Sequence, residues 1–312
     1  MRVVFMGTPD FAVPTLEAIV AAGHTVSLVV SRPDKPRGRG QKPLPSPVKA
    51  AALAMGLPVE HPVKLDGDFI QQLKDLKVDV GVVAAFGRIL PKALLEALPK
   101  GWINVHASLL PSFRGAAPIH RSVINGDAET GITTMLMSEG LDEGDMLLQA
   151  SLPIGPNDKT GQVHDALAQL GACLLVETLD GWEKGTIKPV PQDHARSTYA
   201  AMLTKADEQI QWEQSAEAIH NRVRGMNPWP GAYTMDQGKI LKVTAGRLRR
   251  ESFPLSHSGA PGEIVDVTGD EVAVATGSGL YWLAEVRPAG GKTMAAGAYV
   301  RGRRIGTGFR FG

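Results

Sequence analysis

Polar side chains alternate along one predicted strand near the middle of the chain. Asn104, His106 and Ser108 would share one face of that strand, because successive side chains of an extended chain point to opposite faces. The strand runs into Pro111 and Gly115, where a loop must begin. In open α/β sheets, ligands bind just beyond the carboxyl ends of the strands. The pattern therefore predicts an active site at the end of this strand.

A carboxylate in a second loop completes a candidate catalytic group. Asp142 lies in a glycine-punctuated acidic turn between two predicted strands, within reach of the same sheet edge if the strands are neighbours. An asparagine amide can donate to the oxygen that becomes negative in a tetrahedral intermediate. A histidine can relay the proton of an attacking amine, and a carboxylate orients it and favours its charged form. Asn104, His106 and Asp142 therefore suit acyl transfer to an amine. Because no serine or cysteine is clearly placed as a nucleophile, direct transfer is favoured over a covalent acyl-enzyme.

Predicted strands alternate with helices in the first part of the chain. A strand over 2–6, a helix over 13–22 and a strand over 24–30 form a βαβ opening. A dinucleotide-binding fingerprint would need glycine where Pro9 stands, and proline has no backbone N–H for a pyrophosphate, so NAD binding is rejected. The apolar run 78–85 is typical of a strand covered on both faces. We expect an α/β fold with a Rossmann-like open, mostly parallel sheet and helices on both faces.

The last third of the chain has a different character. Further helices are predicted over 91–98 and 159–179. In the last third, short β-like runs between glycines predict a smaller, OB-like β-barrel domain. We expect a catalytic domain over 1–189, a linker over 190–207 and a C-terminal domain over 208–312.

Residues 32–47 form a predicted loop inserted into the first domain. The segment is too rich in proline and glycine for a helix or a central strand, and it holds five basic residues against one acid, Asp34. Its composition fits a solvated surface loop. It also fits a phosphate-binding arm that orders on contact, since guanidinium groups match phosphate oxygens. Long loops in compact domains are more often functional than idle.

The composition is that of a folded globular protein. Of 312 residues 43% are hydrophobic and 21% charged, and the formal net charge is +1, so a nucleic-acid partner would have to be met by local patches. The single cysteine, Cys173, lies in an apolar helical stretch, where we expect a core residue, and a lone thiol fits a reducing compartment. The first apolar run is too short for a signal peptide, and none approaches the ~18 residues that span a membrane. With no HExxH motif or Cys/His cluster, we expect a cytoplasmic, monomeric protein without metal or membrane partners.

Two motifs resemble those of the folate-dependent formyltransferases. The chain resembles the central signature of that family at Asn104-Val105-His106, at Ser108-Leu109-Leu110-Pro111 and over the run from Arg114 to Ile119. The chain resembles the second motif of the family over residues 140–145, which include Asp142. The resemblance implies 10-formyltetrahydrofolate as formyl donor and Asn104, His106 and Asp142 as catalytic residues. It also implies a folate site made of Ser108, Leu109, Leu110, Pro111, Phe86, Gly87, Gly140 and Leu141.

Within that family the chain is most similar to the members that formylate methionine on initiator methionyl-tRNA. The similarity covers essentially the full length and is carried by residues 7–12, 33–40 and 227–232. In those members an arginine of the insertion loop enters the acceptor stem, and Arg39 aligns with it. The resemblance thus implies initiator methionyl-tRNA as partner, a C-terminal domain that binds it, and candidate contacts at Arg39, Arg37 and Lys42.

Three other interpretations remain. A nucleotide-sugar amine formyltransferase shares the same core, and a formyltetrahydrofolate hydrolase or dehydrogenase domain has a similar second domain. Neither would need the Arg-Gly-Arg-Gly loop around Arg39. A catalytically idle RNA-binding module is the third alternative, and the intact Asn104, His106 and Asp142 argue against it.

We expect Arg39→Ala to weaken the use of tRNA far more than the binding of folate, because the side chain would touch phosphate or stem rather than the formyl donor. Steady-state kinetics with each substrate varied in turn measures both effects. Equal damage to the two substrates would count against the assignment.

Overall fold

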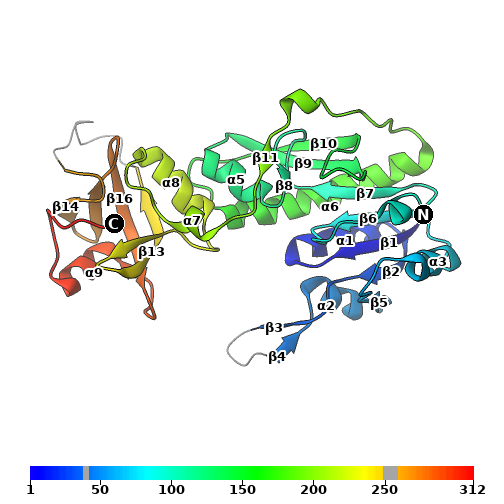
Figure 1. Ribbon diagram of the computed structural model, residues 1–312, viewed down its shortest axis with the longest axis horizontal. Coiled ribbons are helices and arrows are strands. Elements are labelled where there is room, and N and C mark those ends of the chain that lie inside the picture. Colours follow the sequence, from blue (N-terminus) through cyan, green and yellow to red (C-terminus); the bar gives the residue numbers. More distant parts are fainter. Residues whose placement is uncertain (38–41, 249–258) are drawn as a thin grey trace. The chain divides into compact units, whose positions relative to one another are not determined.

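The computed structural model describes residues 1–37, 42–248 and 259–312, and the chain divides into two units (Figure 1). Unit 1 comprises Met1–Pro118, Glu129–Pro153 and His164–Ala200, and unit 2 comprises Ile119–Ala128, Ile154–Val163 and Ala201–Gly312. Unit 2 therefore takes in two short segments from within the predicted first domain.

Unit 1 is built on a mostly parallel sheet, which has seven strands among the described residues. Five neighbouring strands pair in parallel, and two antiparallel strands extend the sheet at one edge. Across the sheet the order is β10 (Met146–Pro153), β9 (Glu129–Leu136), β7 (Trp102–His106), β6 (Val80–Ala84), β1 (Arg2–Gly7), β2 (Thr25–Val30) and β5 (Val59–Glu60). The predicted Rossmann-like class is confirmed.

Helices cover both faces of this sheet (Figure 1). On one face α3 (Gly67–Asp75) and α4 (Lys92–Leu95) share a buried apolar cluster with Val4 and Met6 of β1. On the other face α6 (Thr160–Lys184) lies so close that a Cβ on Gly171 would be 3.0 Å from Val105 Cγ1. The other helical segments in the first part of the chain are η1 (Asp10–Ala12), α1 (Val13–Ala21), α2 (Pro47–Ala54) and α5 (Pro118–Asn125).

Two short strand pairs lie outside the main sheet. The first, β3 (Lys35–Arg37) with β4 (Lys42–Leu44), is antiparallel and forms the base of the insertion. The second, β8 (Arg114–Gly115) with β11 (Tyr199–Ala200), is parallel and joins the loop after β7 to the segment that follows α6 and η2 (His194–Arg196).

Unit 2 is dominated by an antiparallel sheet, as the short glycine-bounded runs predict. Its core includes Ile219 and Val223 from α8, packed with Leu241, Val243 and Tyr281 of the sheet. The elements are α7 (Lys205–Glu208), α8 (Ala216–Gly225), β12 (Tyr233–Asp236), β13 (Lys239–Arg247), β14 (Ile264–Thr268), β15 (Glu271–Ala275), β16 (Leu280–Pro288), β17 (Met294–Ala295) and α9 (Ala296–Arg303). Among the described helices of both units, none is long and apolar enough to cross a membrane.

Two predictions about helices are wrong. The helix expected over 91–98 is the short α4, which ends at Leu95; Pro99 disfavours helical backbone only at Leu98, so it accounts for the loss of the last residue and not for the earlier end. Cys173 is exposed rather than buried, because it lies on the outward stripe of α6, four residues from the exposed Gln169 and Glu177.

Gly81 makes room for the buried indole at the start of β7. Gly81 pairs with Trp102 across β6 and β7, and a Cβ on Gly81 would lie 2.1 Å from Trp102 Cε3. The indole is 1% exposed and its Nε1 donates to Leu94 O at 2.8 Å, which fixes the ring in place.

We expect Gly81→Ala to lower the free energy of unfolding by about 1–3 kcal/mol, because an added methyl group overpacks this contact. Urea unfolding of purified variants measures the change. Gly67→Ala is the matched control, since a Cβ there would meet no heavy atom of the described residues within 4 Å. Equal stability of the two variants would contradict the prediction.

An ion pair in unit 2 holds the carboxyl of Asp207 ionised. Arg121 donates from Nη1 to Oδ1 at 2.7 Å and from Nη2 to Oδ2 at 3.2 Å, while the backbone N–H of Thr204 donates to Oδ2 at 2.8 Å. The hydrogen bond from Arg121 is the main cause that lowers the pKa of Asp207 to about 2.

We expect Asp207→Asn to lower the free energy of unfolding by about 1 kcal/mol near pH 7, after allowance for solvent screening. Because the folded-state pKa is depressed, this stabilisation is complete above about pH 4 and is lost as the pH falls through about 2. Urea unfolding of both proteins at about pH 7 and about pH 3 tests this. A difference that does not shrink at the lower pH would refute the assignment.

Candidate active site

The carboxyl end of β7 presents Asn104 and His106 on one face, as predicted. β7 lies between β6 and β9, where the register sets Asn104 beside Val83 on one side and His106 opposite Thr133 on the other. Val105 points the other way, toward α6. Asn104 is half-buried and the His106 side chain is 6% exposed, so the amide and the imidazole both lie in a partly desolvated environment.

Asp142 approaches these groups from the turn that follows β9. Its φ is +53°, in the left-handed region that aspartate tolerates better than most residues. The turn closes tightly on β9, since a Cβ on Gly144 would lie 1.8 Å from Leu136 O. Only glycine at position 144 lets the chain return along this path.

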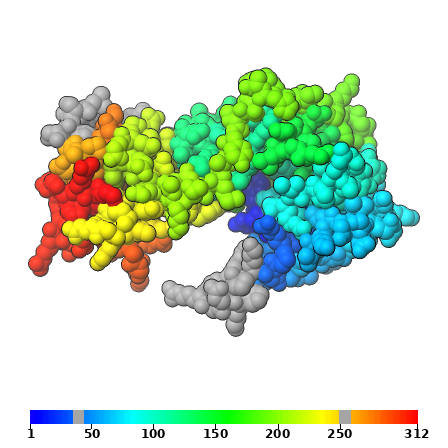
Figure 2. Space-filling model, viewed as in Figure 1, coloured from blue at the N-terminus to red at the C-terminus, as the bar shows by residue number. Residues whose placement is uncertain are grey.

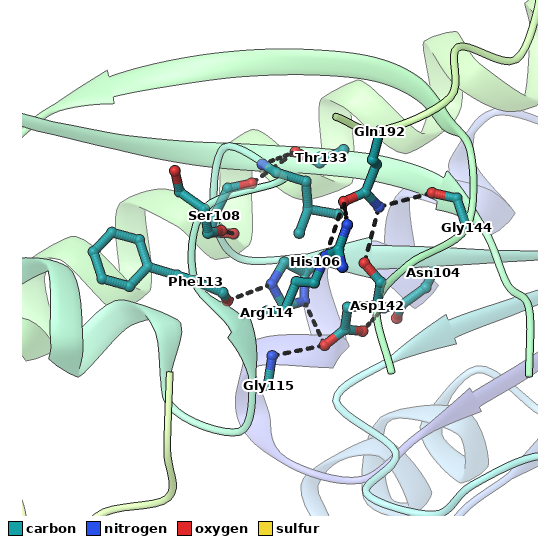
Figure 3. Close-up of polar contacts among 12 residues, drawn as sticks. Asn104, His106, Ser108, Phe113, Arg114, Gly115, Thr133, Asp142, Gly144 and Gln192 are labelled. Atoms are coloured by element: carbon teal, nitrogen blue, oxygen red, sulfur yellow. Dashed lines mark hydrogen bonds and ion pairs between the residues drawn. The ribbon is translucent and has the colours of Figure 1, made fainter. Parts of the chain in front are cut away.

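The three predicted catalytic side chains converge (Figure 3). Asp142 Oδ1 accepts a long hydrogen bond from Asn104 Nδ2 at 3.4 Å. Asp142 Oδ2 lies 3.7 Å from His106 Nδ1 and accepts from the backbone N–H of Gly115 at 2.9 Å. The predicted proximity of amide, imidazole and carboxylate is therefore confirmed, while their catalytic roles stay a prediction.

A backbone carbonyl fixes the tautomer of His106. Its Nε2 lies 3.0 Å from Phe113 O, and because a carbonyl oxygen can only accept, Nε2 must carry a proton. In the neutral ring the lone pair is then on Nδ1, the nitrogen that faces Asp142. The imidazole can take up a proton at Nδ1, and the resulting cation would face a carboxylate.

Ser108 does not join this group. β7 ends at His106, so the alternation that would place Ser108 on the same strand face does not continue, and that prediction is wrong. Ser108 is fully buried and its Oγ donates to Ser112 O at 2.6 Å. Its carbonyl accepts from Thr133 Oγ1 at 2.7 Å, which attaches the loop to β9.

The remaining candidate folate residues lie in three loops, which follow β7, β6 and β9. Leu109, Leu110 and Pro111 follow Ser108, and the backbone of Leu110 is held by Thr133 and by Gln149 Nε2. Of the other candidates, Gly87 accepts from Arg32 Nη2 at 2.6 Å, Phe86 is 2% exposed, Leu141 is 54% exposed, and Gly140 precedes Leu141 in the turn.

The candidate tRNA contacts belong to the insertion. Arg37 ends β3 and pairs in register with Lys42, which begins β4. Arg39 lies outside the described residues.

Sequence reasoning missed two contributors to the site. Phe113 supplies the carbonyl that fixes the His106 tautomer, and its position inside the central motif was an available signal. Gln192 donates from Nε2 to Asp142 O and Gly144 O, both at 2.8 Å, from a segment 50 residues further on. No spacing or periodicity in the sequence points to Gln192.

Within residues 1–37, 42–248 and 259–312 there is no group of three His, Cys, Asp or Glu side chains placed to hold a metal ion.

Sequence comparison relates the chain to formyltransferases along its whole length. The formyl transferase family model matches residues 1–179, and the model of the formyl transferase C-terminal domain matches residues 202–304. A methionyl-tRNA formyltransferase from Heliobacterium modesticaldum is 72% identical over 316 aligned positions, covering 100% of both chains. One from Moorella thermoacetica is 50% identical, covering 97% of this chain and 96% of that protein.

Solved structures share the fold at much lower identity. An N-formyltransferase from Helicobacter canadensis, in complex with folinic acid and dTDP-3-aminofucose, has a TM-score of 0.69 at 18% identity and covers 91% of this chain and 98% of its own. HypX from Aquifex aeolicus, in complex with tetrahydrofolic acid, has a TM-score of 0.64 at 18% identity and covers 96% of this chain and 47% of its own.

Proposed function

The chain belongs to the formyl transferase family, and we propose that it transfers a formyl group from 10-formyltetrahydrofolate to the α-amino group of methionine on initiator methionyl-tRNA. The observation that carries this proposal is the 72% identity, over the full length of both chains, with a methionyl-tRNA formyltransferase. The chain is thus a one-carbon transferase that formylates methionyl-tRNA. In this proposal the reaction takes place in the cytoplasm and prepares initiator methionyl-tRNA for the start of protein synthesis.

Asn104 and His106 have different chemical roles in this proposal. The acceptor amine attacks the formyl carbon directly and the carbonyl oxygen becomes negative. The bond between the formyl carbon and N10 of the donor then breaks, and tetrahydrofolate leaves with the proton that His106 has taken from the amine. Asn104 Nδ2 has a second hydrogen, beyond the one it directs at Asp142, to donate to that oxygen. His106 Nδ1 takes the proton that the amine must lose, since Nε2 is already protonated against Phe113 O.

Asp142 stabilises the protonated imidazole. Its Oδ2, 3.7 Å from Nδ1, faces the positive charge that forms when His106 accepts the proton. Oδ2 is also held by the backbone N–H of Gly115, so the carboxylate does not have to reorganise during the step.

Apolar and backbone groups suit the folate donor. Leu141 is 54% exposed directly beside Asp142, which offers an apolar surface that an aromatic ring system can cover. The backbone N–H of Leu110 donates to Thr133 and its carbonyl accepts from Gln149 Nε2, so the loop is preformed. In this proposal residues 108–111, 86–87 and 140–141 hold the donor, which supplies an activated formyl group.

The basic insertion provides contacts for the second substrate. Arg37, Arg39 and Lys42 give the 32–47 segment a concentration of positive charge along the sequence, and RNA binding depends largely on contacts between such side chains and phosphates. The antiparallel pairing of β3 and β4 joins the two sides of the insertion. We propose that it contacts the tRNA near the end that carries methionine.

We expect the purified protein to formylate charged initiator tRNA when 10-formyltetrahydrofolate is supplied, measured by the transfer of labelled formyl to the aminoacyl-tRNA. Asn104→Ala should lower kcat by about 10²–10³-fold, because it removes a donor to the developing oxyanion. Binding of tRNA by this variant should be unchanged, since the amide acts on the reacting carbonyl.

Two results would overturn the proposal. One is hydrolysis of the folate donor with no formyl group on the aminoacyl-tRNA. The other is formylation by Asn104→Ala at the wild-type rate.

A further inference from the structure

We propose that Gln192 is a positioning residue for the transfer step, which holds the Asp142 turn in register with His106. Gln192 comes from the segment after α6, far from both sequence motifs. The inference rests on the proposed function, because it concerns how Asp142 performs its part in that reaction.

Burial sets Gln192 apart from its neighbours. Within residues 188–200, Gln192 and Ala200 are the two buried residues, and the others are exposed. Figure 2 shows this stretch, in yellow-green, at the surface of the molecule. Gln192 itself is 5% exposed, so a long polar side chain turns inward from an otherwise solvated segment. Burying an amide is unfavourable unless its hydrogen bonds are made.

The amide of Gln192 is fully engaged (Figure 3). Nε2 donates to Asp142 O and to Gly144 O, both at 2.8 Å. Oε1 accepts from Arg114 Nη2 at 2.8 Å and from Arg114 Nε at 3.1 Å. A primary amide has two donor hydrogens and two acceptor lone pairs, so every position is used, and the opposite orientation would break all four contacts.

These bonds hold the turn at the residue whose position matters. Asp142 has positive φ, and its neighbours Leu141 and Glu143 are exposed. The two carbonyls that Gln192 binds belong to Asp142 itself and to Gly144, two residues further along the turn. A shift of the Asp142 backbone would carry its carboxylate away from His106 Nδ1, to which the present distance is already 3.7 Å.

Arg114 ties the same amide to the loop that contacts His106. Arg114 is 6% exposed, and its Nη1 also reaches Glu143 Oε1 at 3.4 Å. Its two chain neighbours act directly on the catalytic group, because Phe113 O accepts from His106 Nε2 and the Gly115 N–H donates to Asp142 Oδ2. Gln192 therefore joins the turn that carries the carboxylate to the loop that fixes the imidazole.

The rest of the segment anchors Gln192 on both sides. Val190 exchanges two backbone hydrogen bonds of 2.8 Å with Met146, at the start of β10. Thr198 Oγ1 accepts from Phe113 N at 2.8 Å and Thr198 O accepts from Arg114 N at 2.9 Å. These contacts fix the backbone from which Gln192 reaches inward.

The test is Gln192→Glu, which keeps the size of the side chain. A carboxylate in place of the amide would direct oxygen at the two carbonyls that now accept from Nε2, and this repulsion should push the Asp142 turn outward. We expect kcat for formylation to fall about 10²-fold, as small misplacements of catalytic groups do. The binding of tRNA and the KM values for both substrates should be unchanged, because Gln192 contacts only the Asp142 turn and Arg114 and not the substrates.

Gln71→Glu is the matched control. Gln71 is an exposed residue of α3 whose Nε2 donates to Asp75 Oδ1 at 2.8 Å, so the same chemical change again opposes two oxygens. Its kcat and KM values should match those of the wild type.

A spectroscopic measurement separates this inference from the proposed function. In protein labelled with ¹⁵N-histidine, the His106 ring signal is identified by its loss in His106→Gln. At one fixed pH it should move in Gln192→Met, which removes the same hydrogen bonds without adding a charge, because the carboxylate that faces Nδ1 is displaced. If the wild type does not formylate tRNA, the proposed function fails, yet this shift still reports whether Gln192 positions the carboxylate. An unmoved His106 signal in Gln192→Met, a rate within twofold of wild type in Gln192→Glu, or a loss of kcat accompanied by an equal rise in KM would each overturn the positioning role.

Discussion

The candidate site depends on a single carboxylate that several chain segments share. The Asp142 side chain is 14% exposed, and a carboxylate with so little access to water needs partners within the protein. It finds the Gly115 N–H, the Asn104 amide and the His106 ring. Because these groups come from β7 and from the loop that follows it, satisfying one charge brings the strand end, the loop and the turn together.

Two glycines make this close approach possible. A side chain at position 144 would collide with the carbonyl of Leu136, and the Asp142 turn could not fold back against β9. Gly115 has a φ of +115°, and a Cβ there would lie 2.6 Å from the ring of Tyr199. Residue 115 can therefore adopt this conformation and donate its backbone N–H to Asp142 only because glycine has no side chain.

The tautomer of His106 is set by the same loop that supplies the carboxylate with a donor. Phe113 O accepts from Nε2, and two residues later the Gly115 N–H binds Asp142. One short stretch thus decides both which imidazole nitrogen can accept a proton and where the carboxylate that faces it lies. In the proposed reaction, this stretch therefore determines how His106 and Asp142 lie toward the amine proton that His106 takes up.

The amino-acid sequence alone predicted the local features of this protein. Alternation along residues 104–106 placed an amide and an imidazole on one face, and the apolar run at 78–85 gave a buried strand, because side-chain direction in a strand is a property of the local backbone. The two motifs pointed to a family that the comparisons confirm.

Tertiary structure decided what depends on register and long-range burial. β7 stops at His106, which turns Ser108 away. β9 runs antiparallel to β7 and ends opposite Ile103, so the turn after β9 must fold back to bring Asp142 to Asn104 and His106. Gln192 reaches the site from 50 residues beyond Asp142. No periodicity encodes such a contact, because it exists only when separate elements are packed against one another and a buried amide must find partners for all its hydrogen bonds.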